Sequence, residues 1–267
     1  MSEILSLIRA GRKPVVGMVQ LEPLAGSCRY NGGRIEAVLE AALREAEILS
    51  VHDVDVLMVQ NLGDLPVDNH ATATQISWMT RVTSEIRQRF GRPVGLNLLE
   101  NDAEAMFAVA SAASADFVRI KVFIGAMMTP FGLETAQSHA AIRARNAVDA
   151  ENIAIFADVH DRTGTPIASG GFEEDLGFAV RLGGADGLVL TGKTYQQTLE
   201  YLAGARKAAH VPILVGGGVT EANFAEVVAL ADGVIVSSSL KGSADAFGKF
   251  DPEKVESFMG AVRRARA

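Results

Sequence analysis

One strand-like phrase recurs four times along the chain and limits its fold more than any other feature. In each copy an aspartate precedes a nearly all-apolar run, which is typical of a parallel strand that is covered on its outer face. The copies are VDVLMVQN (54–61), ADFVRIKV (115–122), ADGLVLTG (185–192) and ADGVIVSS (231–238). Parallel neighbours need long crossover connections, so the phrase predicts repeated βαβ units.

Four further apolar runs bring the number of predicted strands to eight. Successive strands begin about 31 residues apart, which is the length of a βαβ unit. Apolar residues recur at helical spacing between Ile35 and Leu49, and again between Ile76 and Phe90. The predicted strands are Pro14–Leu21, Val54–Asn61, Val94–Leu98, Phe117–Phe123, Ile153–Val159, Gly187–Thr191, Pro212–Gly216 and Gly233–Ser237.

The even repeat of these units predicts an α/β fold, a single (β/α)8 TIM barrel over residues 1–267. No linker or low-complexity segment interrupts the eight units, which favours closure of the sheet. A doubly wound open sheet is the alternative, and it suits eight even repeats less well. Residues 1–13 form an N-terminal extension, which we expect to be a short helix over the bottom of the barrel.

Composition and charge exclude several classes of function. The chain has 267 residues and a formal net charge of −7, so its surface repels nucleic-acid backbones at long range. No apolar run reaches the roughly 18–20 residues of a membrane span, and the N-terminus lacks a secretory signal. Cys28 is the only cysteine, which fits a reducing compartment. We expect a cytoplasmic protein without a membrane span or nucleic-acid partner, and the sequence leaves a homo-oligomer open.

Glycine-rich and serine-rich segments follow the last two predicted strands. LVGGGVT (214–220) and VIVSSSLKG (234–242) occupy the position at which many barrels bind phosphate. Glycines let backbone N–H groups approach an oxygen atom, and serine hydroxyls add donors. The same glycines also suit a tight turn without a ligand, so both interpretations stay open. The predicted phosphate contacts are Gly217, Gly218, Ser238 and Ser239.

Charged and apolar side chains alternate in the fourth predicted strand. Arg119 and Lys121 share one face of this strand, and the apolar residues between them share the other. Two cations buried under helices without partners would be very costly, so we expect both to point into the barrel. Asp158 on the fifth strand is the nearest candidate partner. An Arg119–Asp158 pair fits an interior ion pair and a substrate-binding role equally well.

Other polar side chains are expected at the carboxyl ends of the strands, where barrel enzymes carry their active sites. His160 follows Asp158 with period-2 spacing, and at the mouth it is a candidate acid or base. Lys121 is a candidate Schiff-base lysine if its surroundings lower its pKa. The predicted catalytic residues are His160, Asp158, Lys121 and Arg119, and the predicted substrate-binding residues are Glu22, Asn61, Asn97 and Thr191.

A divalent metal is the one cofactor that the sequence leaves open. Asp158, His160, Asp161 and Glu22 have the side-chain chemistry of ligands, but no HxH or HExxH spacing fixes a site. We therefore assign no metal ligands. The sequence also lacks the P-loop, the GxSxG elbow and a GxGxxG that follows a strand.

Eight segments spread along the chain carry a family resemblance. They are VGMVQLEPLAGSCRY (16–30), VQNLGDLPV (59–67), GLNLLEND (95–102), FVRIKVFIGAMMTPFG (117–132), IFADVH (155–160), LVLTGK (188–193), VGGGVTEANF (215–224) and ADGVIVSSSLK (231–241). Together they resemble the BtpA family, which is named for a cyanobacterial photosystem I biogenesis factor. The resemblance implies a (β/α)8 barrel of the ribulose-phosphate-binding type, similar to barrels that bind phosphorylated ligands.

The sequence departs from the pattern of this family near the predicted mouth. Gln20 stands where the pattern has His, Ala25 where it has Pro, and Lys121 where it has Asn. The segment DRTGTP (161–166) replaces a basic run with a second His. An acid or base role for the family's His therefore does not carry over to Gln20, and the substrate is expected to differ from that of close relatives.

Two functions are consistent with these features. The first is an enzyme for a small phosphorylated or anionic metabolite, such as a sugar phosphate, with lyase, aldolase or isomerase chemistry. His160 or Asp158 would act as acid or base, and Arg119 or Lys121 would stabilise an anion. The alternative, implied by the family resemblance, is a non-catalytic assembly or stability factor with a photosystem I biogenesis-like role. Convergent polar groups at the mouth favour the enzyme, and a large exposed apolar patch favours the assembly factor.

Overall fold

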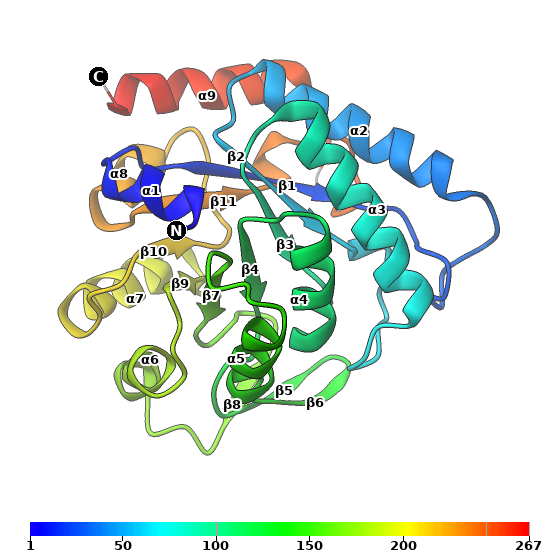
Figure 1. Cartoon of the computed structure of the whole chain (residues 1–267). Helices are drawn as coiled ribbons and strands as arrows, with labels where there is room; N and C mark the ends of the chain where they lie inside the picture. The colour runs from blue at the N-terminus through cyan, green and yellow to red at the C-terminus, as the bar shows by residue number, and fades with distance from the viewer. Residues whose placement is uncertain (100, 244, 267) are drawn as a thin grey trace.

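The structure, a computed structural model, describes residues 1–99, 101–243 and 245–266. Within these residues eight parallel strands close into a barrel, and helices surround them (Figure 1). The first and last strands pair, with Val15 opposite Val234, so the TIM barrel is confirmed and the open-sheet alternative is wrong. Around the barrel the strands are β1 (Val15–Gln20), β2 (Val56–Gln60), β3 (Val94–Asn97), β4 (Phe117–Ile120), β7 (Ala154–Asp158), β9 (Gly187–Leu190), β10 (Ile213–Val215) and β11 (Gly233–Val236).

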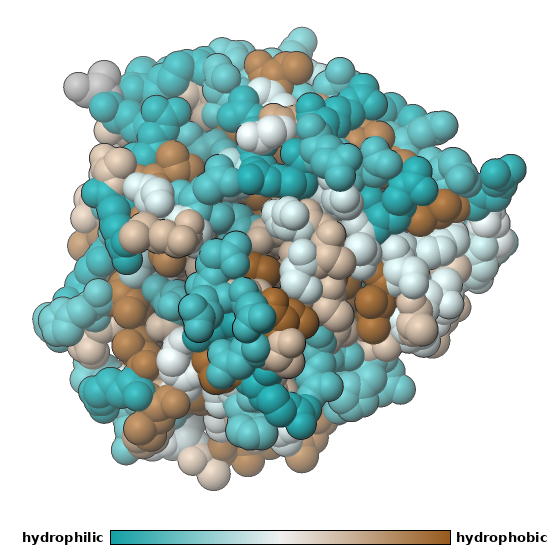
Figure 2. Space-filling view, in the orientation of Figure 1, coloured by the Kyte–Doolittle hydropathy of each residue, from teal (hydrophilic) through white to brown (hydrophobic). Residues whose placement is uncertain are grey.

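Helices connect successive strands on the outside of the barrel. Side-chain caps begin several of them: Thr72 Oγ1 accepts from Gln75 N at 3.2 Å, and Thr194 Oγ1 accepts from Gln197 N at 3.1 Å. On the face seen in Figure 2, hydrophilic groups cover most of the surface, with apolar groups scattered among them. These helices are α2 (Ile35–Val51), α3 (Ala73–Phe90), α4 (Ala103–Ala112), α5 (Ser138–Ala147), α6 (Phe172–Arg181), α7 (Tyr195–Ala208), α8 (Phe224–Leu230) and α9 (Pro252–Arg266), with 3-10 turns η1 (Leu62–Asp64) and η2 (Ser238–Leu240).

The described helices contain no segment that is both long and apolar enough to cross a bilayer.

Barrel side chains alternate between two apolar regions, one under the helices and one inside the barrel. Val118 and Ile120 pack in the region under the helices, whereas Phe117 packs inside the barrel with Phe156. The rings need space, and a Cβ at the inward-facing Gly95 would lie 2.1 Å from the ring of Phe117. This alternation turns the intervening residues of β4 inward, which confirms the register expected from the sequence.

Strand β4 is shorter than predicted, because it ends at Ile120 rather than at Phe123. Beyond it, the backbone of Val122 bonds to a side chain instead of a neighbouring strand. Val122 N donates to Asn101 Oδ1 at 2.9 Å, and Asn101 Nδ2 donates to Val122 O at 3.1 Å. The side chain of Asn101 thus satisfies these backbone groups and allows the chain to leave the barrel.

A small antiparallel sheet, which the sequence did not predict, lies apart from the barrel (Figure 1). Two of its strands follow β4, and the third comes from the loop after β7. The central strand pairs on both sides, with Met128 opposite Leu133 and Thr165. The small sheet therefore ties the loops after β4 and β7 together. Its strands are β5 (Ala126–Thr129), β6 (Gly132–Thr135) and β8 (Thr165–Ile167).

Helix α1 (Glu3–Arg9) lies against the interior of the barrel through Ile4, which is fully buried among inward-facing residues of the strands. Asp116, just before β4, accepts hydrogen bonds from the first turn of this helix. Its carboxylate binds Glu3 N at 2.5 Å, Ile4 N at 2.8 Å and Ser2 Oγ at 3.0 Å. A single aspartate thus caps the helix and holds Ile4 in place.

Replacing Ile4 by alanine should destabilise the fold. Loss of a fully buried aliphatic side chain leaves a cavity, so we expect the free energy of unfolding in urea to fall by about 2–4 kcal/mol. Leu182→Ala removes a side chain that is 78% exposed, and it should change the same free energy by less than about 0.5 kcal/mol. Equal effects of the two substitutions would contradict the packing of Ile4 inside the barrel.

Candidate active site

A cavity of about 450 Å³ opens at the carboxyl ends of the barrel strands. Its polar walls come from all eight strands or from the residues that directly follow them. This position is where (β/α)8 barrels carry their active sites. The strand-borne polar or glycine positions are Gln20, Gln60, Asn97, Arg119, Asp158, Thr191, Gly216 and Ser237.

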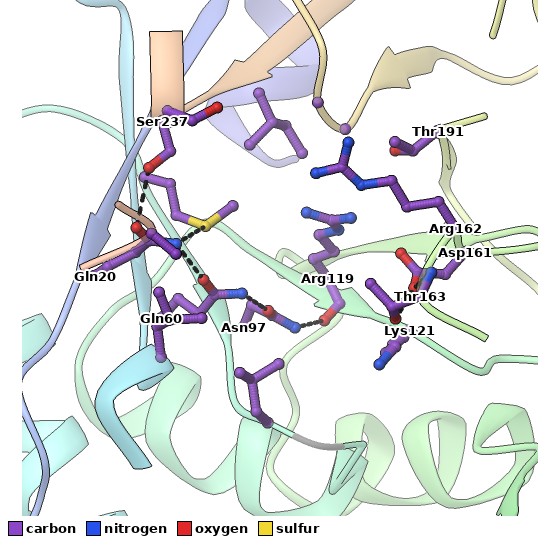
Figure 3. A pocket seen from close by; sticks show the side chains of 18 of the residues that line it. Gln20, Gln60, Asn97, Arg119, Lys121, Asp161, Arg162, Thr163, Thr191 and Ser237 are labelled. Atoms are coloured by element: carbon purple, nitrogen blue, oxygen red, sulfur yellow. Dashed lines mark hydrogen bonds between the residues drawn. The ribbon is translucent and has the colours of Figure 1, made fainter. Parts of the chain in front are cut away.

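A chain of amide hydrogen bonds crosses one side of the mouth from β1 to β4 (Figure 3). Gln20 Nε2 donates to Gln60 Oε1 at 3.0 Å, and Gln60 Nε2 donates to Asn97 Oδ1 at 2.6 Å. Asn97 Nδ2 then donates to the carbonyl oxygen of Arg119 at 3.0 Å. Each amide is oriented by the next, so the polar edges of these side chains are held in place. Asn97 was predicted from the sequence, whereas Gln60 was missed.

Lys241 binds to the first amide of this chain from the loop after β11. Its Nζ donates to Gln20 Oε1 at 2.5 Å and also to the carbonyl oxygen of Ala246. Ser237 Oγ donates to the same Gln20 oxygen at 3.0 Å. Burial lowers the pKa of Lys241, although the carboxylates of nearby acidic residues oppose this effect.

Arg119 and Asp158 form a buried ion pair inside the barrel. Arg119 Nε and Nη2 donate to the two carboxylate oxygens of Asp158, each at 2.7 Å. This bidentate geometry is the strong form of the arginine–carboxylate pair. Burial raises the pKa of Asp158 to about 6, against the opposing effect of the Arg119 charge. Arg119, like Asp158, lines the cavity, as predicted.

Lys121 lies where the main cavity meets a second cavity of about 360 Å³, and it lines both. Burial lowers the pKa of Lys121, while the charges of Asp161, Asp158 and Glu134 oppose that shift. Burial also raises the pKa of Glu134, on the small sheet, against the charge of Lys121. Lys121 therefore loses its proton at a lower pH than an ordinary lysine does. The nearby carboxyl groups of Asp158 and Glu134 keep their protons to a higher pH than ordinary carboxyl groups do.

The segments after β10 and β11 line the cavity opposite the amide chain. Gly217 and Gly218 follow β10, and Ser238 and Ser239 follow β11, as the phosphate prediction requires. Gly218 has a φ of +75°, a backbone conformation that side chains with a Cβ rarely adopt. The structure thus brings the four predicted phosphate contacts to one wall.

Arg162 and Thr191 complete the polar lining on this side. Figure 3 shows the guanidinium groups of Arg162 and Arg119 both pointing into the cavity. Thr191, a predicted substrate-binding residue, is 3% exposed. Arg162 was missed, because no local pattern tells a loop arginine that faces the mouth from one that faces solvent.

Three predicted site residues lie outside the main cavity. His160 has a φ of +54°, which breaks the period-2 alternation, so it does not share a face with Asp158. His160 Nε2 instead lies 2.7 Å from Asp175 Oδ2, in the second cavity. The expected position of His160 at the main mouth is therefore wrong.

The placements of Asn61 and Glu22 also need correction. Asn61 is fully buried, donating from Nδ2 to Asp64 Oδ2 at 2.9 Å and accepting from Leu99 N at 2.7 Å, so it braces a loop. Glu22 forms a 3.2 Å ion pair with Lys249 beside a third cavity of about 240 Å³. Neither residue lines the main cavity.

The candidate metal ligands do not gather at one point. Glu22 lies at the third cavity and His160 at the second, Asp161 lines the main cavity, and Asp158 lines both the main and the second cavity. Within the part of the chain that the structure describes, no three His, Cys, Asp or Glu side chains form a group that could hold a metal ion.

The raised pKa of Asp158 should appear in the pH dependence of stability. Unfolded aspartates titrate near pH 4, so between about pH 4 and 6 the folded chain binds the extra proton. The contribution of Asp158 to stability is therefore complete below pH 4 and is lost as pH rises through 6. We expect the unfolding free energy of the wild type, minus that of Asp158→Asn, to fall over this range in urea titrations. A rising difference would contradict the shift.

Comparisons with known proteins agree with this fold. Tryptophan synthase from M. tuberculosis is 15% identical to the chain, with a TM-score of 0.65, covering 99% of this chain and 98% of its own. N-(5'-phosphoribosyl)anthranilate isomerase from Pyrococcus furiosus is 18% identical, with a TM-score of 0.56 and coverage of 94% and 98%. At these identities the likeness concerns the barrel fold alone.

Sequence comparison gives a closer relationship. Photosystem I biogenesis protein BtpA of Synechocystis sp. is 34% identical over 253 residues, which are 93% of this chain and 88% of that protein. The model of the BtpA family matches residues 11–264. This match spans nearly the whole barrel, including every strand that lines the mouth. The chain therefore belongs to the BtpA family.

Proposed function

We propose that this chain is an enzyme that acts on a small phosphorylated or otherwise anionic metabolite at the mouth of its barrel. The charge of the mouth carries the proposal. Cationic side chains outnumber carboxylates in the described lining, although the whole chain has a net charge of −7. Such a local excess attracts anions and raises their concentration at the site. The cations are Arg119, Lys121, Arg162 and Lys241, and the carboxylates are Asp158 and Asp161.

The wall after β10 and β11 is suited to the phosphate end of the ligand. Gly217, Gly218, Ser238 and Ser239 line the same cavity, and in this proposal their backbone N–H groups and hydroxyls are the donors. Uncharged donors of this kind bind an oxyanion without needing a counter-ion of their own. One structural neighbour is named for a phosphoribosyl compound, which is consistent with a phosphorylated ligand in a barrel of this type.

The reacting end of the ligand would lie against β4 and β7. Asp158, with a pKa of about 6, can accept and return a proton near neutral pH. Lys121 and Arg119 would stabilise the negative charge that develops on an oxygen during aldol-type cleavage or isomerisation. His160, in the second cavity, acts in this scheme only if the ligand reaches past Lys121. We therefore assign acid and base work to Asp158 and anion stabilisation to Lys121 and Arg119.

A non-catalytic assembly role is the second candidate. The small sheet and its turn expose apolar side chains, with Met128 51%, Leu133 50%, Ile167 42% and Phe131 37% exposed. A surface of this kind suits a protein partner. Such a role requires no small anion in the barrel, so ligand binding at the mouth separates the two candidates.

A negative charge on the phosphate wall should weaken anion binding. We expect Ser239→Asp to weaken the binding of inorganic phosphate by at least about tenfold, because it removes a donor and adds a repelling charge. Isothermal titration calorimetry at fixed ionic strength measures this loss. Ser77→Asp makes the same change on the exposed surface of α3 and should leave the affinity unchanged.

No measurable phosphate binding by the wild type, or equal losses in both variants, would contradict the proposed function and favour the assembly role.

A further inference from the structure

Arg162, in the loop after β7, is an exposed residue that lines the main cavity. Within residues 1–99, 101–243 and 245–266, the Arg162 side chain has no hydrogen bond or ion pair. Its guanidinium nevertheless points into the main cavity, as Figure 3 shows. Because the described residues do not use its donors, this guanidinium can bind an anion that enters the cavity.

The turn that carries Arg162 is held in a fixed shape. Asp161 Oδ1 accepts from Thr163 N at 2.9 Å and also from the Thr163 hydroxyl, and Gly164 N donates to Asp161 O at 3.2 Å. The next residues form β8, which pairs with the central strand of the small sheet. The base of the Arg162 side chain is therefore braced from both sides.

A buried hydroxyl close to the two arginines also lacks a partner. Thr191 Oγ1 makes no hydrogen bond in the described structure, although the residue is 3% exposed. A buried polar group without a partner is costly. Among the buried side-chain atoms without a partner in the described structure, Thr191 Oγ1 is the one whose residue lines the main cavity. Thr191 lies after β9 and lines the same cavity as Arg119 and Arg162.

Gly216 and Gly217 leave open the space between these donors. A Cβ at Gly216 would lie 2.5 Å from Thr191 Oγ1 and 3.0 Å from Arg119 Nη2. A Cβ at Gly217 would lie 3.5 Å from Arg162 Nη2. The glycines thus form a cradle that any larger residue would fill, with three donor groups around it.

We propose that Arg119, Arg162 and Thr191 form a second oxyanion subsite, which binds a carboxylate of the substrate beside its phosphate. Arg119 donates from Nε and from one N–H of Nη2 to Asp158. Nη2, the atom nearest the Gly216 cradle, has a second N–H that remains for a ligand. A planar carboxylate matches the fork of a guanidinium. Asp158 already neutralises the charge of Arg119, so Arg162 supplies the positive charge for the ligand. The proposal rests on the proposed function and narrows its substrate class to phosphorylated carboxylic acids.

The subsite adjoins the phosphate wall at Gly217 and extends from there deeper into the barrel. Thr191 and Arg119 are 3% and 8% exposed, whereas Ser238 is an exposed residue. A ligand with its phosphate at Ser238 and Ser239 would therefore direct its carboxylate inward, next to Asp158 and Lys121. This orientation places the carbon atoms adjacent to the carboxylate near the groups that transfer protons.

A matched pair of small ligands tests the second subsite. 3-Phosphoglycerate has a carboxylate at the end where glycerol 3-phosphate has a hydroxymethyl group, and the two are otherwise alike. Inorganic phosphate probes the phosphate wall alone. We expect the wild type to bind 3-phosphoglycerate at least about tenfold more tightly than glycerol 3-phosphate in calorimetric titrations. Arg162→Gln should remove most of this preference and change the affinity for inorganic phosphate by less than about threefold. Arg9→Gln, on α1, is the control and should keep the preference.

Thr191→Val separates ligand binding from folding. Valine has the shape of threonine without the partnerless hydroxyl, so the melting temperature should stay equal or rise, while the preference for 3-phosphoglycerate falls several-fold. Equal affinities of the wild type for the two organic phosphates, with inorganic phosphate still bound, would overturn the second subsite alone. Equal losses for all three ligands in Arg162→Gln would also overturn it. Failure of the wild type to bind any of the three would overturn the proposed function as well.

Discussion

The buried pair of Arg119 and Asp158 is the interaction on which the mouth of this barrel depends. An arginine inside a barrel is tolerated only if its charge is neutralised and its donors are used. Asp158 meets both conditions with two 2.7 Å bonds from the adjacent strand. The carbonyl oxygen of Arg119 then anchors the amide chain through Asn97. Arg119 thus takes part in both the ion pair and the amide chain, and these contacts together orient polar groups from β1 to β7.

Period-2 alternation was sufficient to predict the charged strand residues of the site, although it did not identify Gln60 on β2. It placed Arg119 and Lys121 inside the barrel, because their apolar neighbours had to face the helices. It also identified Asp158, on the next strand of the barrel, as the nearest candidate partner of Arg119, and the two form an ion pair. The argument works wherever the backbone stays extended, since each residue then reverses the direction of the side chain before it.

The same argument failed where the chain leaves the sheet. His160 has a left-handed φ, so its side chain turns away from the mouth toward Asp175. The end of β4 depends on Asn101, a side chain about 20 residues earlier, and no local pattern announces that contact. The small sheet joins β5 and β8, segments far apart in sequence, and it is this pairing that braces the turn of Arg162. Loop positions therefore could not be predicted, because long-range contacts determine them.

The mouth divides into a half that positions and a half that can transfer protons. From β1 to β3 the polar side chains that line it are amides, which do not titrate, so the chain from Gln20 to Asn97 orients groups without carrying a proton. Two groups with shifted pKa values lie on the other side of the mouth: Asp158 ends β7, and Lys121 directly follows β4. Lys241, whose pKa burial also lowers, reaches Gln20 from the loop after β11. The carboxylates of the mouth lie on the side of the barrel that Arg119 and Asp158 order, and there Lys121 adds a cation beside them.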